Sequence, residues 1–157
     1  MSKRNILLIA AVAAIAIPLA YAANVHFKGP NPTFVDQGTT LSSCFSLTGL
    51  GNQDVIITIK ATGFATTTCT NQGGNAAPGQ NKTPVSPTGQ ISVPSTQIKN
   101  GNLRVCLTTQ PPPAPTAKEA GCPNNNWATS LQDVEFTTAE IIVMQGGQVV
   151  LDTKFPL

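Results

Sequence analysis

Charged side chains are scarce in this sequence: Asp, Glu, Lys and Arg make up 10% of the 157 residues. Two of the nine basic residues, Lys3 and Arg4, lie at the start, so seven remain beyond residue 22 (9 − 2 = 7), balanced by seven acidic residues. The formal net charge of that part is zero. A chain without a basic patch cannot neutralise a row of phosphates, which argues against nucleic acid as a partner.

Groups that commonly perform catalysis are also few. The single histidine, His26, lies near the start of the chain beyond residue 22, where a general base would be held poorly. Asp133 and Glu135 have the spacing that puts two carboxylates on one strand face, as a glycosidase requires, but such a pair is more often a solvated outer face. We therefore predict no catalytic residue and no cofactor, and hence a protein that is not an enzyme.

The first 22 residues have the order of a secretory signal peptide. A basic start is followed by an apolar run, Ile6 to Ile17, and by the A-x-A cleavage site Ala20-Tyr21-Ala22. The run of 12 residues is shorter than the roughly 18 needed to span a bilayer, which argues against a retained anchor. We predict cleavage after Ala22, secretion to the extracellular space or cell envelope, membrane contact only through the transient signal peptide, and one domain over residues 23–157.

All four cysteines follow the predicted cleavage site: Cys44, Cys69, Cys106 and Cys122. An even number of cysteines in an exported protein indicates disulfides, here two. A zinc site is the alternative, but no two cysteines have C-x2-C spacing, and His26 is distant from all four in sequence. We therefore predict two disulfides and no metal site.

The spacing of apolar residues is that of β-strands. Apolar and polar side chains alternate over residues 41–48, 55–60, 103–108 and 141–151. Within the last of these, Gly146-Gly147 fits a two-residue hairpin turn, which needs positive φ. Together with the turn-rich segments between these runs, the pattern predicts an all-β fold: an antiparallel, immunoglobulin-like β-sandwich of about seven to eight strands with two disulfides.

Strand alternation also favours one pairing of the cysteines. Cys44 and Cys106 lie on the faces opposite to the large apolar residues of their strands, so they can be joined only across neighbouring strands of one sheet. Cys69 lies on the inward side of its strand, and Cys122 remains as its partner. We favour Cys44–Cys106 with Cys69–Cys122, provided that no bulge at Gly63 reverses the alternation.

The segment from Cys69 to Lys82 is rich in glycine and asparagine. Gly74 and Gly79 have phosphate-loop spacing, but neither the required Lys-Ser/Thr pair nor a helix follows, and the segment has no carboxylate for calcium. We interpret it as a disulfide-tethered surface loop in which glycine supplies positive φ and asparagine bonds to the backbone. Asn81-Lys82-Thr83 also matches an N-glycosylation acceptor.

The only tryptophan of the chain, Trp127, follows three asparagines, Asn124, Asn125 and Asn126. An aromatic face beside several amides is a common way to build a sugar-binding site. The alternative is that Trp127 is the core aromatic residue of the sandwich beside a disulfide, as in immunoglobulin-like folds. Because Cys122 is so close in sequence, we favour the core position.

Three stretches of the chain carry a resemblance: DVIITIKATGFATTTCTNQGGNAAPGQNK, IKNGNLRV and AGCPNNNWATSLQDVEFTTAEIIVMQGGQVVL. They resemble a family of secreted bacterial proteins of this size that have no assigned activity, and the resemblance covers nearly the whole chain beyond residue 22. It implies export and a shared fold, and it supplies no activity. Members of the family often carry only the cysteines that correspond to Cys69 and Cys122, which implies that Cys44 and Cys106 are an added pair.

Two functions remain open for such an exported, non-catalytic module. The first is a structural protein of the extracellular matrix, the cell surface or a filament, which associates with copies of itself through strand edges. Val25 and Phe27 alternate with polar residues in a segment that can form the first strand of its own sheet or add to a neighbour's sheet. The C-terminal strand, residues 148–153, has only Asp152 to protect its edge.

The second function is that of a soluble module that binds an extracellular carbohydrate or another polymer. Its site would be made by the aromatic ring and the amides of Trp127, Asn124, Asn125 and Asn126.

Overall fold

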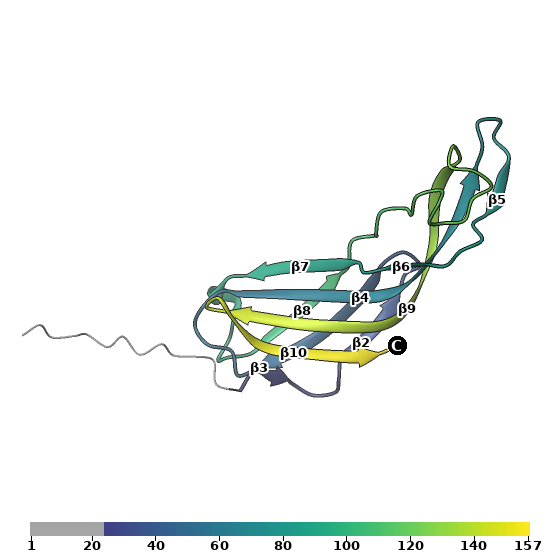
Figure 1. The fold of residues 1–157 in the computed structure, drawn as a ribbon. Coiled ribbons are helices and arrows are strands. Elements are labelled where there is room, and N and C mark those ends of the chain that lie inside the picture. Colours follow the sequence, from purple (N-terminus) through teal and green to yellow (C-terminus); the bar gives the residue numbers. More distant parts are fainter. Residues whose placement is uncertain (1–23) are drawn as a thin grey trace, which may run out of the picture.

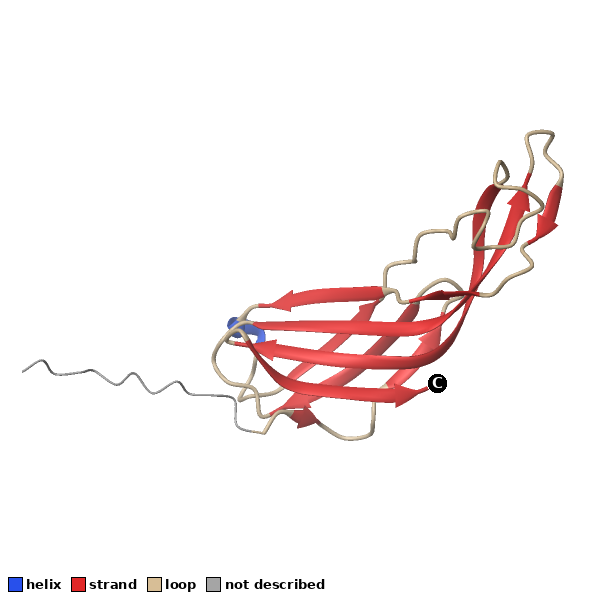
Figure 2. Cartoon of the chain, viewed as in Figure 1, coloured by secondary structure: helices blue, strands red, loops and turns tan. Residues whose placement is uncertain are grey.

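The computed structural model of the chain describes residues 24–157 (Figure 1). The predicted signal peptide and its cleavage point lie outside the described residues. Within residues 24–157 no helix is long and apolar enough to cross a membrane. Figure 2 shows strands joined by loops, with one short 3₁₀ turn as the helical segment. This part of the chain is therefore all-β, as predicted.

Residues 24–157 form ten strands and the 3₁₀ turn η1. Their bounds are β1 (His26–Phe27), β2 (Thr33–Asp36), β3 (Leu41–Thr48), β4 (Val55–Thr70), β5 (Ala76–Pro78), β6 (Thr83–Val85), β7 (Thr88–Val93), η1 (Ser95–Gln97), β8 (Leu103–Thr108), β9 (Ala128–Gln145) and β10 (Gln148–Pro156).

The first sheet, here sheet A, is built around β3. On one side β3 pairs antiparallel with β8. The other edge of β3 is shared by two short strands: β2 pairs with the first half of β3, and β1 pairs with its last two residues. The sequence Gly29-Pro30-Asn31-Pro32 separates β1 from β2, because proline has no N–H to donate to a ladder. Sheet A thus has three strand positions.

The second sheet, sheet B, is built around β4. On one side β4 pairs with β9, which in turn pairs with β10. Three short strands share the other edge of β4: β7 pairs with residues 55–60, β6 with residues 63–65 and β5 with residues 68–70. Sheet B therefore has four strand positions. The seven positions in two antiparallel sheets confirm the predicted immunoglobulin-like sandwich. One difference from constant-type antibody domains is that the strand at the fourth position in chain order, β7, pairs with β4 and so belongs to sheet B.

The core lies between the two sheets and follows from the alternation read in the sequence. Along β3 and along the first half of β4, every second residue is buried, as period-two strands with one solvated face require. The largest fully buried side chains of this core are Leu41, Leu47, Val55, Ile57, Ile59, Val134, Ile141 and Val143. Phenylalanines close the side at β1, β2 and β10, where the Phe155 ring lies 5.8 Å from that of Phe27 and 5.3 Å from that of Phe34.

The ends of β4 and β9 continue beyond the sandwich and project from it, together with β5 (Figure 1). We call this projection, residues 66–82 and 111–133, the arm, and the remainder of residues 24–157 the body. The β4–β9 register shifts between Thr62 and Gly63 and again between Thr66 and Thr67, and each shift leaves one extra residue on β9. Such bulges bend and twist a ladder, which is how the two strands leave the sandwich.

Both predicted disulfides are confirmed. Cys44 and Cys106 are directly opposite each other on β3 and β8, with a Cα–Cα distance of 4.1 Å, and both side chains are exposed on the outer face of sheet A. Cys69 is fully buried and is joined to Cys122 inside the arm. The alternation of β4 runs unbroken past Gly63, because the bulge there lies on β9, so Cys69 keeps its inward position.

Two turns behave as the sequence predicts. Gly146 and Gly147, with φ of 61° and 78°, form the two-residue connection between β9 and β10. At the start of the glycine-rich loop, Gly74 has a φ of 80°, and the Asn71 side chain accepts a hydrogen bond from the backbone N–H of Asn75 at 2.9 Å. Glycine and asparagine thus have the structural roles expected of them.

Candidate functional sites

The outer edge of β7 has no strand partner among residues 24–157. The strand, TGQISV, contains neither a charged residue nor proline, and Pro87 and Pro94 flank it. Ile91 points toward the inner face of sheet B but is 37% exposed, whereas the buried Gly89 packs closely against the backbone of Thr108. The sandwich is therefore closed at both ends of β7, where Gly89 and Val93 are buried, and open between them at Ile91.

Hydrogen bonds show which backbone groups this edge presents. The N–H of Ala61 on β4 donates to the carbonyl of Pro87 at 2.9 Å, so by alternation Gly89, Ile91 and Val93 also point their backbone groups toward β4. The backbone groups of Thr88, Gln90 and Ser92 consequently point outward. The carbonyl of Thr88 already accepts the N–H of Gln110 at 2.8 Å, which leaves Gln90 and Ser92 as the open part of the edge.

The edge of β10 is better protected than the sequence suggested. The prediction that Asp152 alone protects a strand of residues 148–153 is wrong, because β10 extends to Pro156 and includes Lys154, which forms an ion pair with Glu140 at 3.3 Å. A register shift between Val149 and Leu151 also interrupts its ladder. A bulge, an added charge and a proline are all features that discourage pairing with a further strand.

The sequence predicts two roles for the N-terminal segment, a strand of its own sheet or a strand added to a neighbour's sheet, and the structure shows the first. His26 and Phe27 pair with Thr48 and Leu47 of β3, so the segment forms a strand of its own sheet. Val25 is 6% exposed and belongs to the core, and the Phe27 ring lies 5.5 Å from that of Phe45 in an edge-to-face arrangement. Both side chains are occupied within their own domain, so removal of this strand would uncover the core.

Trp127 lies in the arm, half-buried and outside the sandwich core, so its predicted core position is wrong. It immediately precedes β9, five residues after Cys122 in the sequence. Asn124, Asn125 and Asn126 are exposed, and the side chain of Asn124 accepts a hydrogen bond from the backbone N–H of Asn126 at 2.9 Å. The prediction failed because Cys122, the cysteine close to Trp127 in sequence, belongs to the disulfide of the arm and not to one in the sandwich core.

The carboxylates and the histidine singled out in the sequence lie apart on the surface. Asp133 and Glu135 are exposed on β9, and Glu135 forms an ion pair with the exposed Lys82. His26 is exposed, with Nδ1 2.9 Å from the carbonyl oxygen of Asn24. Among the residues that the structure describes, no group of three or more His, Cys, Asp and Glu side chains is placed to hold a metal ion.

One further carboxylate organises a turn of the arm. The hydroxyl and the backbone N–H of Thr116 donate to the Glu119 carboxylate at 2.7 and 2.8 Å, and the backbone N–H of Glu119 donates back to the Thr116 hydroxyl at 3.3 Å. This reciprocal arrangement is a capping box. The hydrogen bond from the Thr116 side chain, followed by that from its backbone, lowers the pKa of Glu119.

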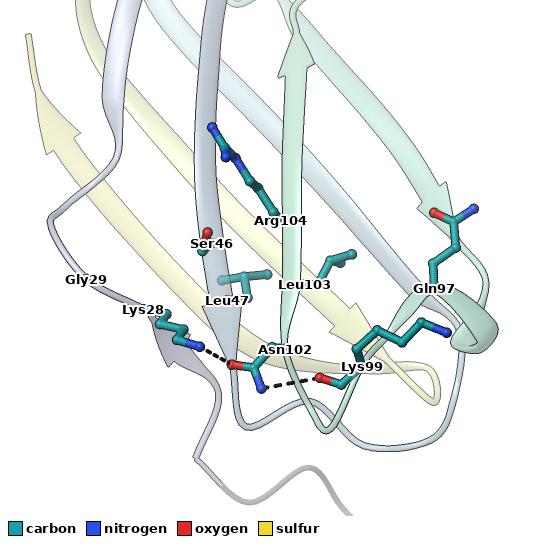
Figure 3. Close-up of a pocket in the computed structure, with 9 residues that line it drawn as sticks. All are labelled: Lys28, Gly29, Ser46, Leu47, Gln97, Lys99, Asn102, Leu103 and Arg104. Atoms are coloured by element: carbon teal, nitrogen blue, oxygen red, sulfur yellow. Dashed lines mark hydrogen bonds between the residues drawn. The ribbon is translucent and has the colours of Figure 1, made fainter.

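A cationic groove lies on the outer face of sheet A (Figure 3). It is a hollow of about 650 Å³ lined by three basic side chains and no acidic one, and its residues are Lys28, Gly29, Ser46, Leu47, Gln97, Lys99, Asn102, Leu103 and Arg104. A second, smaller hollow of about 200 Å³ shares Lys28, Ser46 and Arg104 and continues toward Asn31 and Thr33. The two hollows therefore form one surface across β1, β3 and β8.

Local structure explains how the groove's cations come together. Lys28 follows β1 and donates its backbone N–H to the carbonyl of Ser46 at 2.8 Å, while Arg104 on β8 lies directly opposite Ser46 from the other side. A tight turn at Asn100 and Gly101, whose φ values of 51° and 74° are those of an Asn-Gly hairpin turn, pairs Lys99 with Asn102 at one end of the groove. The Lys99 side chain runs toward Gln97, away from Lys28 and Arg104 (Figure 3), and its Nζ donates to the carbonyl of Thr96 at 3.2 Å. Lys28, Ser46 and Arg104 thus form a row across three neighbouring strands.

The side chain of Asn102 holds this arrangement in place. Its oxygen accepts a hydrogen bond from Lys28 Nζ at 3.0 Å, and its nitrogen donates to the carbonyl of Lys99 at 3.3 Å (Figure 3). The same nitrogen also donates to the carbonyl of Asn100 at 2.8 Å. The two ion pairs within residues 24–157 are Lys82–Glu135 and Lys154–Glu140, so neither involves a cation of the groove. The cations of the groove therefore have no carboxylate partner among the described residues.

Models of known protein families and the sequences of curated proteins provide no match to the chain. The functional conclusions therefore depend on the geometry of the molecule itself. The sequence did not predict the groove, because Lys28, Lys99 and Arg104 are isolated basic residues, two of them far from the third along the chain. The open edge of β7 had a readable signal, an uncharged strand between two prolines, which the stronger alternation elsewhere obscured.

Proposed function

We propose that the protein is an exported, non-catalytic structural subunit that associates with copies of itself through the open edge of β7. The observation that carries this proposal is the uncharged, unpaired edge of Gln90 to Ser92 with Ile91 37% exposed beside it. Proteins normally protect such edges with charge, proline or a bulge, as this chain does at β10. An edge left unprotected is a template for strand addition.

A second copy is the occupant that fits this edge best. When two β7 strands pair antiparallel about a two-fold axis through Ile91, Gln90 of each copy lies opposite Ser92 of the other, and each pair exchanges both backbone hydrogen bonds. The two Ile91 side chains then meet as direct cross-strand neighbours and cover each other's exposed surface. In this register Thr88 of one copy lies opposite Pro94 of the other. The ladder ends at that pair, because the Thr88 carbonyl is already bonded and Pro94 has no N–H.

Two other features support an extracellular place of work for this subunit. The two disulfides indicate an oxidising compartment, since such bonds are rare in reducing cytosol. The signal-peptide order of residues 1–22 accords with export. The resemblance to secreted bacterial proteins supports the same location, and a surface subunit of a matrix or filament needs no catalytic group.

The proposal is tested by the oligomeric state of the chain from residue 23 onward. Sedimentation velocity should show a concentration-dependent dimer, and Ser92→Pro should make the protein monomeric without lowering its thermal stability. Proline at this position removes only an outward-pointing N–H and leaves the β4–β7 hydrogen bonds intact. Ile91→Cys should form a disulfide-linked dimer on oxidation, because directly opposed residues of this kind lie about 4.5 Å apart at Cα, within disulfide range.

Val149→Cys on β10 is the matched control, since Val149 is also exposed, at 57%, but lies on the protected edge. It should give little cross-linked dimer under the same conditions. A wild-type protein that stays monomeric at millimolar concentration would show the proposal to be wrong. So would a dimer that Ser92→Pro leaves unchanged, because that dimer would use another surface.

A further inference from the structure

We propose that the cationic groove of sheet A binds an acidic polysaccharide through the carboxylates of its sugar residues. This site is separate from the β7 edge and from the Trp127 region, and it does not depend on self-association. Its central observation is the concentration of three of the seven basic side chains of residues 24–157 around one hollow, in a domain whose formal net charge is zero. Such a local excess creates a positive potential that attracts anions.

The row of Lys28, Ser46 and Arg104 suits a ligand with more than one negative charge. Adjacent strands lie about 4.8 Å apart, so the backbone positions of Lys28 and Arg104 are separated by about 10 Å, with the Ser46 hydroxyl between them. Lys99 places a third charge on the Gln97 side of the larger hollow, where its Nζ is bonded to the carbonyl of Thr96. A single small anion would reach one or two of these cations, whereas an extended chain with repeated carboxylates can reach all three.

Arg104 is the group best suited to hold a carboxylate. Its side chain is exposed and lies in both hollows, and no hydrogen bond or ion pair within residues 24–157 engages its guanidinium group. A free, planar guanidinium can donate two parallel hydrogen bonds to a carboxylate. Lys28, in contrast, is held at a fixed position by Asn102, which reduces the entropy lost when it binds an anion.

The floor of the groove is stabilised by the exposed disulfide. Cys44 and Cys106 are the pair directly next to Ser46 and Arg104 on the outer face of the same two strands, and Cys44 lines the smaller hollow. The covalent bond therefore fixes the separation of β3 and β8 where the ligand would lie. This placement gives the surface disulfide a role in the site beyond the stability of the fold.

The neutral groups of the groove favour a sugar polymer over a nucleic acid. Ser46, Gln97, Asn31 and Thr33 supply hydroxyl and amide groups of the kind that bond to sugar hydroxyls. Single-stranded nucleic acid sites usually combine a longer basic track with aromatic side chains on which bases stack, and the larger hollow is lined by no aromatic residue. The volume of about 650 Å³ lies in the range of small-ligand sites and accommodates a short oligosaccharide.

The test is calorimetric titration at low salt with a tetramer of galacturonic acid, carried out in the Ser92→Pro background so that self-association does not contribute. The acidic tetramer should bind, and added NaCl should weaken the binding because surface charges are screened. Arg104→Ala should weaken it about tenfold, the size expected for loss of one charged hydrogen bond. Arg104→Lys should retain part of the affinity, since the charge remains but the planar donor pair is lost.

Lys60→Ala supplies the matched control, because Lys60 is an exposed cation on the outer face of sheet B, away from the groove. It should bind the tetramer as the parent does. The proposal is overturned if the acidic tetramer fails to bind or if Lys60→Ala weakens binding as much as Arg104→Ala. Equal binding of a neutral glucose tetramer, or tighter Arg104-dependent binding of a single-stranded oligonucleotide, would also overturn it by assigning the groove to another ligand class.

Discussion

The body and the arm are built from the same two strands, β4 and β9, but they are held together in different ways. In the body these strands bury large branched side chains, among them Ile57, Ile59 and Ile141, none of which is measurably exposed. In the arm the buried residues are Thr67, Cys69, Ala117, Ala120 and the prolines Pro112 and Pro115, none of them a large branched residue. Since hydrophobic stabilisation grows with the apolar area removed from water, the body gains far more from burial than the arm.

The two disulfides also differ between the body and the arm, both in their burial and in the kind of region that they join. Cys44–Cys106 lies exposed on a sheet that is already paired and packed, whereas Cys69 is fully buried and joins β4 to the turn that carries Cys122. A segment with few large apolar contacts must limit its unfolded freedom by another means, and a covalent link does so. One continuous strand thus belongs to a region stabilised by burial at one end and to a region stabilised by a disulfide at the other.

The largest expected effect is therefore that of removing the arm's disulfide. In the loop-entropy model, a bond closing 53 residues contributes about 4 kcal/mol, so Cys69→Ser with Cys122→Ser should open the arm. Trp127 is the only tryptophan and lies in the arm, so its fluorescence reports on that region, while far-UV circular dichroism reports mainly on the strands of the body. In urea, the fluorescence transition of this variant should precede the circular-dichroism transition.

Cys44→Ser with Cys106→Ser is the matched comparison, because its 62-residue loop predicts a similar loss of about 4 kcal/mol. Here both probes should shift together, since the loss falls on the body. Coincident transitions in the Cys69/Cys122 variant would mean that arm and body unfold as one unit, and the distinction between them would fail.

A smaller effect, of opposite sign, is expected from Thr67. Its side chain is 5% exposed, and its hydroxyl has no hydrogen-bond partner within residues 24–157. A buried polar atom without a partner is costly, so Thr67→Val, which has nearly the same shape, should stabilise the arm by about 1 kcal/mol. The gain should appear as a shift of the Trp127 fluorescence transition to higher urea.

Thr62→Val is a suitable control, because the Thr62 hydroxyl lies 2.5 Å from that of Thr138 and is satisfied. This variant should be neutral or destabilising. A loss of stability in Thr67→Val equal to that in Thr62→Val would show that the Thr67 hydroxyl is satisfied in solution, and the account of the arm interior would need revision.

The sequence predicted the body well because its signals are local. Alternation identified β3, β4 and β8, the Gly146-Gly147 pair identified the last hairpin, and the inward or outward position of each cysteine gave the correct disulfides. Each of these follows from period-two geometry or from the φ that a turn requires.

The arm and the groove could not be predicted in the same way. In the threonine-rich end of β4, polar and small residues occupy both faces, so hydrophobic alternation no longer marks the strand. Gly63 also indicated a possible bulge in its own strand, although glycine is needed there because Phe136 and Glu135 of β9 leave no room for a Cβ. The groove depends on the pairing of strands that are distant in sequence, which places Lys28 and Arg104 on either side of Ser46. A local sequence pattern cannot predict that these residues lie close together.

The smallest predicted effect concerns the pH dependence of the arm. Hydrogen bonds from Thr116 lower the pKa of Glu119 in the folded state, so the capping box stabilises the arm above the unfolded glutamate pKa of about 4.3. That contribution is lost as the pH falls through the depressed folded-state pKa. Glu119→Gln keeps an acceptor that can cap the turn but cannot titrate, so its arm stability, followed by Trp127 fluorescence, should fall less than that of the wild type between pH 5 and pH 3. The two proteins differ only at residue 119, so the difference between the two curves isolates Glu119. If the curves are parallel over this range, the Glu119 carboxylate does not hold the turn in solution, and the disulfide and small-residue packing alone maintain the arm.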